Sequence, residues 1–204
     1  MNANNILVLA PHTDDGELGL GGTISKFISE GRKVTYVAFS TAEGFPKDIL
    51  KTEVRNATAK LGILPENLII YSYQVRKLNY VRQEILEELI LLKKSQKFDL
   101  VFIPSLHDIH QDHTTIAQEG VRAFKNTTIL GYELIWNNLT FNTQCFITLG
   151  ENDIERKILA LKEYQSQGQR DYLSEEFIYS LARARGVQVG VEYAEAFEVV
   201  RLFI

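Results

Sequence analysis

The chain has 204 residues, with 22 basic and 26 acidic side chains and a formal net charge of −4. This mild acidity argues against broad nucleic-acid binding, because no excess of positive charge is present to replace phosphate counterions. The single cysteine, Cys145, excludes both an internal disulfide and a zinc site built on several thiolates. The length fits one folding unit, so we expect a single domain over residues 1–204.

The N-terminal apolar run covers residues 6–10 and stops at Pro11. It is too short for a signal peptide, and no later run approaches the ~18 apolar residues of a membrane span. We therefore expect a cytoplasmic chain without a membrane span.

Short apolar runs alternate with segments of helical periodicity. In chain order we expect a strand over 6–10, a helix over 21–30, a strand over 34–39, a helix over 48–61, a strand over 68–71, a helix over 80–95, a strand over 99–103, a helix over 113–125, strands over 129–132 and 145–149, helices over 154–164 and 175–185, and a strand over 196–203. Such alternation implies right-handed crossovers. The predicted fold class is α/β, a single Rossmann-like three-layer domain with a mostly parallel sheet and helices on both faces.

The segment after the first strand places a histidine and three carboxylates within six residues: His12, Asp14, Asp15 and Glu17. Adjacent aspartates repel each other at a partly buried strand end, and a cation would neutralise them. The alternative is a solvated turn in which an aspartate caps the following helix. A dinucleotide site is disfavoured, because Ile24 stands where the third glycine of that fingerprint belongs.

Three of the four histidines lie within seven residues after the fourth predicted strand: His107, His110 and His113. Asp108 and Asp112 are interleaved with them, as expected where carboxylates orient imidazoles through the second ring nitrogen. The first and fourth strands of a doubly wound sheet can be neighbours, which would bring both segments together. The pattern predicts a metal site with histidine and carboxylate ligands, for zinc or alternatively Fe(II), Co(II) or Mn(II).

These paired motifs resemble those of the LmbE-like, or PIG-L-type, N-acetylglucosaminyl deacetylases. The family motif His-Pro-Asp-Asp, followed by an acidic residue, is similar to residues 12–19, and Asp-x-His-Pro-Asp-His is similar to residues 108–113. Further similarity lies in residues 53–62, 160–167 and 190–197, so the resemblance covers nearly the whole chain.

The chain departs from the family pattern at three positions. Thr13 and Gln111 replace motif prolines, which removes no ligand. Leu50 stands where many members carry an arginine, so a substrate contact is either lost or supplied from elsewhere, with Arg76 and Lys51 as the candidates.

The resemblance implies that one divalent metal, usually zinc, is bound by three residues: His12, Asp15 and His113. It also implies that Asp14 is the general base, that a protonated His110 stabilises the transition state, and that Asp112 orients His110. The implied reaction is hydrolysis of the acetamide of an N-acetylglucosamine-type sugar or conjugate, which gives a free amine and acetate.

Other residues have competing interpretations. We expect Arg76, Trp136 and Tyr193 to contact substrate, although aromatic side chains more often pack in a core. An interaction with the helix dipole is the simpler explanation for Glu17 at a helix start, and for Arg183 and Arg185 at a helix end. His107 has no assigned role.

Two further function classes stay open. A metal-dependent phosphoester hydrolase is disfavoured, because the sequence shows neither a second carboxylate-bridged metal set nor a Walker-type loop. A non-catalytic metal- or sugar-binding module would need neither Asp14 nor His110 in these places. The expected partner is a small amino-sugar substrate, not nucleic acid; the sugar's attached group and a homo-oligomeric state are left open.

Overall fold

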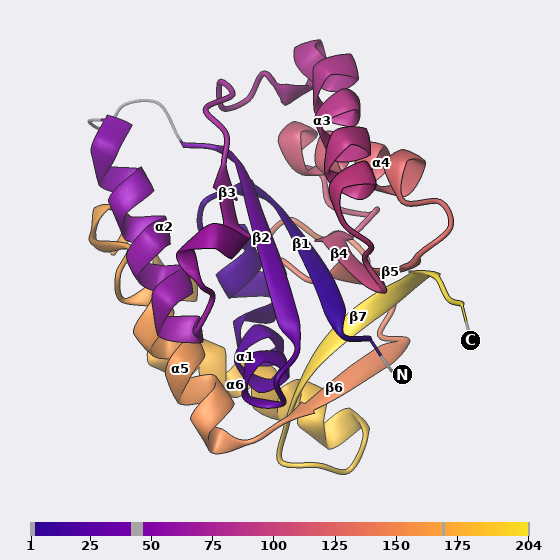
Figure 1. The fold of residues 1–204 in the computed structure, drawn as a ribbon. Helices are drawn as coiled ribbons and strands as arrows, with labels where there is room; N and C mark the ends of the chain where they lie inside the picture. The colour runs from indigo at the N-terminus through magenta and orange to yellow at the C-terminus, as the bar shows by residue number, and fades with distance from the viewer. Residues whose placement is uncertain (1–2, 42–46, 169, 204) are drawn as a thin grey trace.

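The structure, a computed structural model, describes residues 3–41, 47–168 and 170–203. Within these residues, seven strands form one sheet in the order β3-β2-β1-β4-β5-β7-β6 (Figure 1). The strands are β1 (Asn5–His12), β2 (Lys33–Ser40), β3 (Leu68–Ile70), β4 (Leu100–Pro104), β5 (Thr128–Tyr132), β6 (Cys145–Leu149) and β7 (Tyr193–Arg201).

The sheet is parallel from β3 to β5, with β1 paired to both β2 and β4. β7 runs antiparallel to its two neighbours, β5 and β6. The predicted mostly parallel sheet is therefore confirmed, with an antiparallel edge that the sequence pattern did not indicate. The predicted adjacency of the first and fourth strands is also confirmed.

Helices cover both faces of the sheet. One layer contains α1 (Asp15–Ser29), α2 (Lys47–Leu61), α5 (Glu151–Leu161) and α6 (Glu175–Gln188), and the other contains α3 (Arg82–Ser95) and α4 (Gln111–Ala123) (Figure 1). Alternate residues of β1 face opposite layers: Ile6 and Val8 pack with the α1 layer, and Leu7 and Leu9 pack with the α3 layer. Burial on both faces explains why this strand is an unbroken apolar run.

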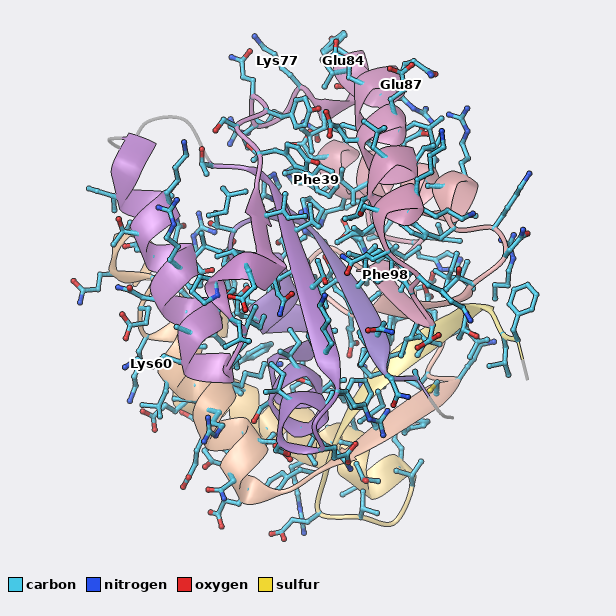
Figure 2. The ribbon with its side chains drawn as sticks, in the orientation of Figure 1. Phe39, Lys60, Lys77, Glu84, Glu87 and Phe98 are labelled. Carbon is cyan, nitrogen blue, oxygen red and sulfur yellow. The ribbon has the colours of Figure 1, made fainter. Side chains whose placement is uncertain are left out.

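The second core also contains Phe39 and Phe98, which lie among side chains between the sheet and α3 (Figure 2). Each large apolar side chain buried in this way contributes about 1.5–3 kcal/mol to folding. Charged side chains such as Glu84 and Glu87 point away from the core at the outer surface of α3 (Figure 2). Among the described residues, no helix combines the length and hydropathy needed to cross a bilayer.

Helix α1 begins at Asp15, six residues earlier than predicted. The backbone at Leu20 is not helical (φ −150°, ψ 27°), so α1 consists of two segments, and the predicted helix corresponds to the second. The main-chain N–H groups of Gly22 and Thr23 donate to the carboxylate of Glu195, at 3.1 and 2.7 Å. A carboxylate from β7 therefore caps the second segment, where it also suits the helix dipole.

The first segment of α1 packs directly on the sheet because two of its residues lack side chains. A Cβ atom on Gly16 would lie 2.5 Å from the Tyr36 ring, and one on Gly19 would lie 2.3 Å from the Tyr132 ring. These glycines lower helix propensity, and the sequence pattern therefore indicates a loop where the structure has a helix.

Candidate metal centre

The two polar segments meet at the edge of the sheet where the parallel strands end. His12 is the last residue of β1, and Asp15 is the first residue of α1. Residues 105–110 connect β4 to α4, and His113 lies in the first turn of α4. Because β1 and β4 are neighbours, side chains 100 residues apart in the sequence face the same space.

Three candidate ligand atoms converge. His12 Nδ1 lies 3.1 Å from Asp15 Oδ2, Asp15 Oδ2 lies 3.3 Å from His113 Nε2, and the two histidine nitrogens are 3.2 Å apart. Ligands about 2.0–2.1 Å from a tetrahedral metal are separated by roughly 3.3 Å. The spacing therefore fits one divalent cation bound by two nitrogens and one oxygen.

His110 is a third possible nitrogen ligand. One nitrogen from each of His12, His110 and His113 lies within 4.8 Å of the others. The set containing Asp15 has the shorter distances, all between 3.1 and 3.3 Å, and it includes a carboxylate that balances the charge of a cation. We therefore take His12, Asp15 and His113 as the better donor set.

Carboxylates contact the second ring nitrogen of both candidate ligand histidines. Asp108 Oδ2 lies 2.7 Å from His113 Nδ1, and Asp112 Oδ2 lies 3.0 Å from His12 Nε2. These contacts fix which nitrogen faces the cation position. The interleaved aspartates were correctly expected to orient imidazoles.

The specific partner predicted for Asp112 was wrong. Its carboxylate contacts His12, and it also accepts hydrogen bonds from the main-chain N–H groups of Arg76 (2.6 Å) and Leu78 (3.2 Å). Only the main-chain N–H of Asp112 reaches His110, where it donates to Nδ1 at 3.2 Å. His110 is the N-cap residue of α4. Its main-chain N–H donates a hydrogen bond to Asp108 Oδ1 at 2.8 Å.

The protonation expected for His110 also differs. Burial and the neighbouring His113 and His12 lower the pKa of His110 below its ordinary value, which favours the neutral ring. Because Nδ1 accepts a hydrogen bond, the proton of the neutral ring resides on Nε2. The lowered pKa favours a neutral ring, with Nε2–H as hydrogen-bond donor, over the imidazolium that the resemblance implies.

The candidate ligand side chains carry strongly shifted pKa values. Burial lowers the pKa of His12, but the neighbouring carboxylates of Asp15 and Asp112 have the larger effect and raise the pKa of His12 to about 9. Burial likewise opposes the charge of His113, whereas Asp15 and Asp108 raise its pKa to about 10. Burial would raise the pKa of Asp15, but the two imidazoles hold that pKa well below its usual range. The centre thus favours positive charge, carried either by protons or by a cation.

Asp14 lies beside this centre and makes no capping hydrogen bond with its side chain. It is buried, and burial together with the neighbouring Asp15 raises its pKa to about 6. A carboxyl group with this pKa is ionised at neutral pH yet remains basic enough to accept a proton.

Below the ligand segment, Glu17 is fully buried rather than placed at an exposed helix end. The hydroxyl groups of Tyr36 and Tyr164 contact both its carboxyl group and the carbonyl of Thr13. Burial raises the pKa of Glu17 to about 8. Sequence reasoning missed this network, because its tyrosines come from β2 and from the segment after α5.

The centre opens into a cleft of about 690 Å³. Of the predicted substrate contacts, Arg76 and Trp136 line the cleft, and so does Leu50. Trp136 stacks on Tyr172 with ring centroids 3.9 Å apart. Tyr172 and Arg170 also line the cleft, but no sequence signal marked them, since they belong to a distant irregular segment.

Other predicted residues lie elsewhere. Tyr193 begins β7, packs edge-on against Tyr179 of α6 and does not line the cleft, so the structure does not support its prediction as a substrate contact. His107 Nδ1 lies 2.8 Å from the buried Glu198 and has a structural contact instead of a place in the cleft. Lys51 does not line the cleft either.

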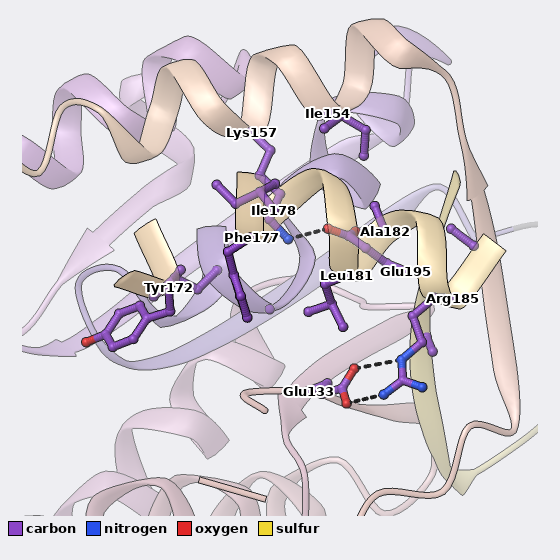
Figure 3. A pocket seen from close by; sticks show the side chains of 14 residues that line it. Glu133, Ile154, Lys157, Tyr172, Phe177, Ile178, Leu181, Ala182, Arg185 and Glu195 are labelled. Atoms are coloured by element: carbon purple, nitrogen blue, oxygen red, sulfur yellow. Dashed lines mark hydrogen bonds and ion pairs between the residues drawn. The ribbon is translucent and has the colours of Figure 1, made fainter. Parts of the chain in front are cut away.

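A second, much smaller cavity of about 30 Å³ lies between α1, α5 and α6 (Figure 3). Its charged groups are paired: Lys157 Nζ lies 2.7 Å from Glu195, and Arg185 forms two hydrogen bonds with Glu133 (Figure 3). This pairing leaves Arg185 unavailable for an anionic ligand, and Arg183 contacts Glu192. The cavity has space for about one water molecule and is a structural feature.

Comparisons with known proteins agree with this arrangement. The profile of the PIG-L family, described as GlcNAc-PI de-N-acetylase, matches residues 7–124 and so spans the strands and loops that carry the site. An Escherichia coli protein described as the uncharacterized deacetylase YaiS is 27% identical over 169 residues, which cover 79% of this chain and 90% of that protein.

Two solved structures have the same fold. The conserved protein TT1542 from Thermus thermophilus has a TM-score of 0.83 and 25% identity, with 98% of this chain and 96% of that chain covered. The N,N'-diacetylchitobiose deacetylase from Pyrococcus horikoshii has a TM-score of 0.75 and 22% identity, with 98% and 84% covered.

Proposed function

The chain belongs to the PIG-L family, and from this premise we propose that it is a zinc-dependent deacetylase that hydrolyses the acetamide of an N-acetylglucosamine-type sugar or conjugate. The observation that carries the proposal is the convergence of His12, Asp15 and His113, with Asp14 beside them in an open cleft. The diacetylchitobiose deacetylase of similar fold supports an amino-sugar substrate.

The three convergent residues would hold the cation. Zinc suits this set, because two imidazoles and one carboxylate leave a coordination position open, although Fe(II), Co(II) and Mn(II) accept similar ligands. A divalent metal in such a site polarises the acetamide carbonyl and lowers the pKa of a water molecule toward ~7.

Asp14 and His110 would perform the proton chemistry. Asp14, with a pKa of about 6, accepts the proton of the attacking water and then passes it to the departing amine. His110 donates its Nε2–H to the oxyanion that develops on the carbonyl oxygen, and a preorganised donor of this kind contributes about 3–4 kcal/mol. Asp108 positions His110 and His113 together, since its carboxylate contacts both residues.

The test is a release assay with purified protein. We expect acetate and free amine from N-acetylglucosamine conjugates, loss of turnover after chelation, and recovery when zinc is added. Release of phosphate from aryl phosphates instead would identify a phosphoester hydrolase. Tight zinc binding without turnover of either substrate class would identify a binding module and refute the proposal.

The role of Asp14 has its own test. Asp14→Asn removes the proton acceptor but leaves all three ligand residues, so we expect metal to be retained and kcat to fall at least ~100-fold. Metal content by elemental analysis and kcat from initial rates measure the two effects. A kcat near that of the unmodified protein would remove Asp14 from the role of general base.

A further inference from the structure

We propose that Glu198, a buried carboxylate on β7, is a positioning residue for the reaction. It holds the loop over residues 105–110 in place and so determines where His110 presents its Nε2–H to the substrate. This inference rests on the proposed function, because it concerns the oxyanion donor of the same site. Glu198 does not line the cleft, so it acts only through other residues.

Glu198 reaches this loop across an intervening strand. β5 lies between β4 and β7 in the sheet, and Gly131 of β5 is paired with Glu198. A Cβ atom on Gly131 would lie 3.3 Å from Glu198 Oε2 and 3.3 Å from the Cα atom of Ser105. The glycine therefore leaves room for the carboxylate to pass over β5. Beyond it, Ser105 follows the last residue of β4, and its hydroxyl donates to Glu198 Oε2 at 2.6 Å.

The carboxylate contacts two residues of the turn that opens the loop. The turn spans residues 105–108, and the main-chain N–H of Asp108 donates to the carbonyl of Ser105 at 3.2 Å. Glu198 Oε2 accepts from the hydroxyl of Ser105, while Oε1 lies 2.8 Å from His107 Nδ1. The Ser105 hydroxyl oxygen also accepts from the main-chain N–H of His107 at 3.0 Å. One side chain of β7 thus fixes the first and third residues of the turn.

The turn leads directly to His110. Asp108, the last residue of the turn, accepts the main-chain N–H of His110 at 2.8 Å and lies 2.7 Å from the ring of His113. The ring of His110 accepts the main-chain N–H of Asp112 at 3.2 Å. A displacement of the turn is therefore passed to His110 through hydrogen bonds between near neighbours. A displacement of about 1 Å at a reacting group can reduce a rate by roughly 100-fold.

The same carboxylate also holds a second loop at the rim of the cleft. Glu198 Oε1 accepts the main-chain N–H of Asn142 at 3.2 Å, in the segment between β5 and β6. This segment contains Trp136, which lines the cleft. The two loops also contact each other, because the main-chain N–H of Ile109 donates to the carbonyl of Asn137 at 3.1 Å. Glu198 therefore fixes both loops relative to the sheet.

The first experiment observes the histidine rings by NMR. The chain has four histidines, so a spectrum of the imidazole ¹⁵N signals contains four rings, which single His→Asn variants assign. In zinc-loaded protein at pH 7.5, we expect Glu198→Gln to change the ring signals of His110, because the amide keeps the volume but replaces an acceptor by a donor. Ser105→Ala, which removes only the hydroxyl contact, should change the signals of the same ring.

Glu119→Gln is the matched control, because Glu119 is a buried glutamate of α4 that pairs with Arg82 and Arg122 away from the cleft. It should leave all four rings unchanged. A change confined to His107, which contacts Glu198 directly, would overturn the inference. Unchanged His110 signals in both Glu198→Gln and Ser105→Ala would overturn it as well.

The second experiment measures kinetics on protein whose zinc content is confirmed by elemental analysis. We expect Glu198→Gln and Ser105→Ala to lower kcat ~10-fold and to change KM less than ~3-fold, because the oxyanion forms only in the transition state. In a His110→Ala background, Glu198→Gln should lower the residual kcat by less than ~2-fold, because the residue through which it acts is absent. A role in stability alone would not depend on His110, so a further ~10-fold loss in that background would overturn the inference.

The NMR measurement separates failure of this inference from failure of the proposed function, because it does not depend on turnover. Absence of turnover with every N-acetylated sugar, together with a His110 ring that responds to Glu198→Gln, would refute the deacetylase proposal and support the positioning of His110 by Glu198. Turnover by the unmodified protein, with an unchanged kcat in Glu198→Gln and Ser105→Ala, would overturn the inference and leave the deacetylase proposal intact.

Discussion

Asp112 connects three parts of the site, because its carboxylate contacts the ring of His12 and the main-chain N–H groups of Arg76 and Leu78. Asp108 holds His113 through one contact of the same type. Carboxylates in this position raise the basicity of the ligand imidazole and fix its orientation. In the proposed centre, the two aspartates would therefore contribute to metal affinity although neither belongs to the proposed donor set.

We predict that Asp112→Asn and Asp108→Asn each weaken zinc binding by ~10–100-fold. Competition with a chromophoric chelator measures the affinity. The exposed Asp171 offers a matched control, since Asp171→Asn touches neither histidine. Zinc affinities within twofold of the unmodified protein would contradict this account of the two carboxylates.

Glu17 shows how a proton completes a buried network. Four contacts join the hydroxyls of Tyr36 and Tyr164 to the carbonyl of Thr13 and to the two oxygens of Glu17, but the hydroxyls supply only two protons. A proton on the carboxyl group allows Glu17 to donate in a third contact, to a tyrosine oxygen. This count agrees with the pKa of about 8, which burial produces.

A carboxyl group whose pKa is raised on folding stabilises the protein below its unfolded pKa, near 4.5, and loses that contribution as pH rises toward 8. Glu17→Gln keeps the shape and a donor without the titration. We predict similar stabilities at pH 4.5 and a variant that is more stable by roughly 2–4 kcal/mol at pH 8.5. Urea unfolding of the metal-free proteins at both pH values tests this. A variant that is less stable at pH 8.5 would show that the folded protein stabilises the ionised carboxylate, and that folding does not raise the pKa of Glu17.

Among the elements, α1 depends on β7 and α5 for its second segment. Glu195 accepts hydrogen bonds from Gly22 and Thr23 and pairs with Lys157, and all of these groups are buried (Figure 3). Removal of one member of a buried ion pair leaves an uncompensated charge, which costs about 3–5 kcal/mol.

We predict the greatest loss of stability for Glu195→Ala, which removes the cap and leaves the buried charge of Lys157 without its partner. Lys157→Met should cost less, because two N–H groups still stabilise the remaining carboxylate. The free energies of unfolding in urea at pH 7 give the order. If Lys157→Met is the more damaging change, the ion pair rather than the cap determines the position of α1.

The predicted elements and the observed ones agree where local periodicity decides the structure. β1 and β4 are unbroken apolar runs because both faces are buried, and the ligand clusters follow these strands directly in the sequence. Contacts between distant segments were not predictable. Glu195 caps a helix more than 170 residues away, and Asp112 faces His12 instead of its near neighbour His110 only because β1 adjoins β4. Arg170 and Tyr172 reach the cleft from an irregular segment without a periodic signal.

For the whole molecule, the topology places a charged, convergent centre at one edge of a sheet whose two faces pack against largely apolar cores. Without metal, protons on His12 and His113 compensate Asp15, Asp108 and Asp112. With metal, both imidazoles must be neutral, so binding releases protons. Folding, metal binding and pH are therefore linked through the same two rings.

The direction of this linkage follows from the raised pKa values, about 9 for His12 and about 10 for His113, against 6.5 for an ordinary histidine. Their stabilising contribution is complete below pH 6.5 and is lost as pH rises toward 9–10. We predict that the metal-free protein loses stability over this range, by as much as about 1 kcal/mol per pH unit for each ring. Stabilisation by zinc should increase over the same range, because fewer protons compete for the nitrogens.

Thermal unfolding from pH 6.5 to 9, with chelator and with excess zinc, measures both curves, which should diverge as pH rises. Calorimetry at pH 7.5 in buffers of different ionisation enthalpy should show the release of about two protons per zinc. His113→Ala is the control, since loss of one ligand should abolish both the divergence and most of the proton release. Parallel curves for the unmodified protein would mean that zinc binds away from these rings, and the donor set would then have to be reassigned.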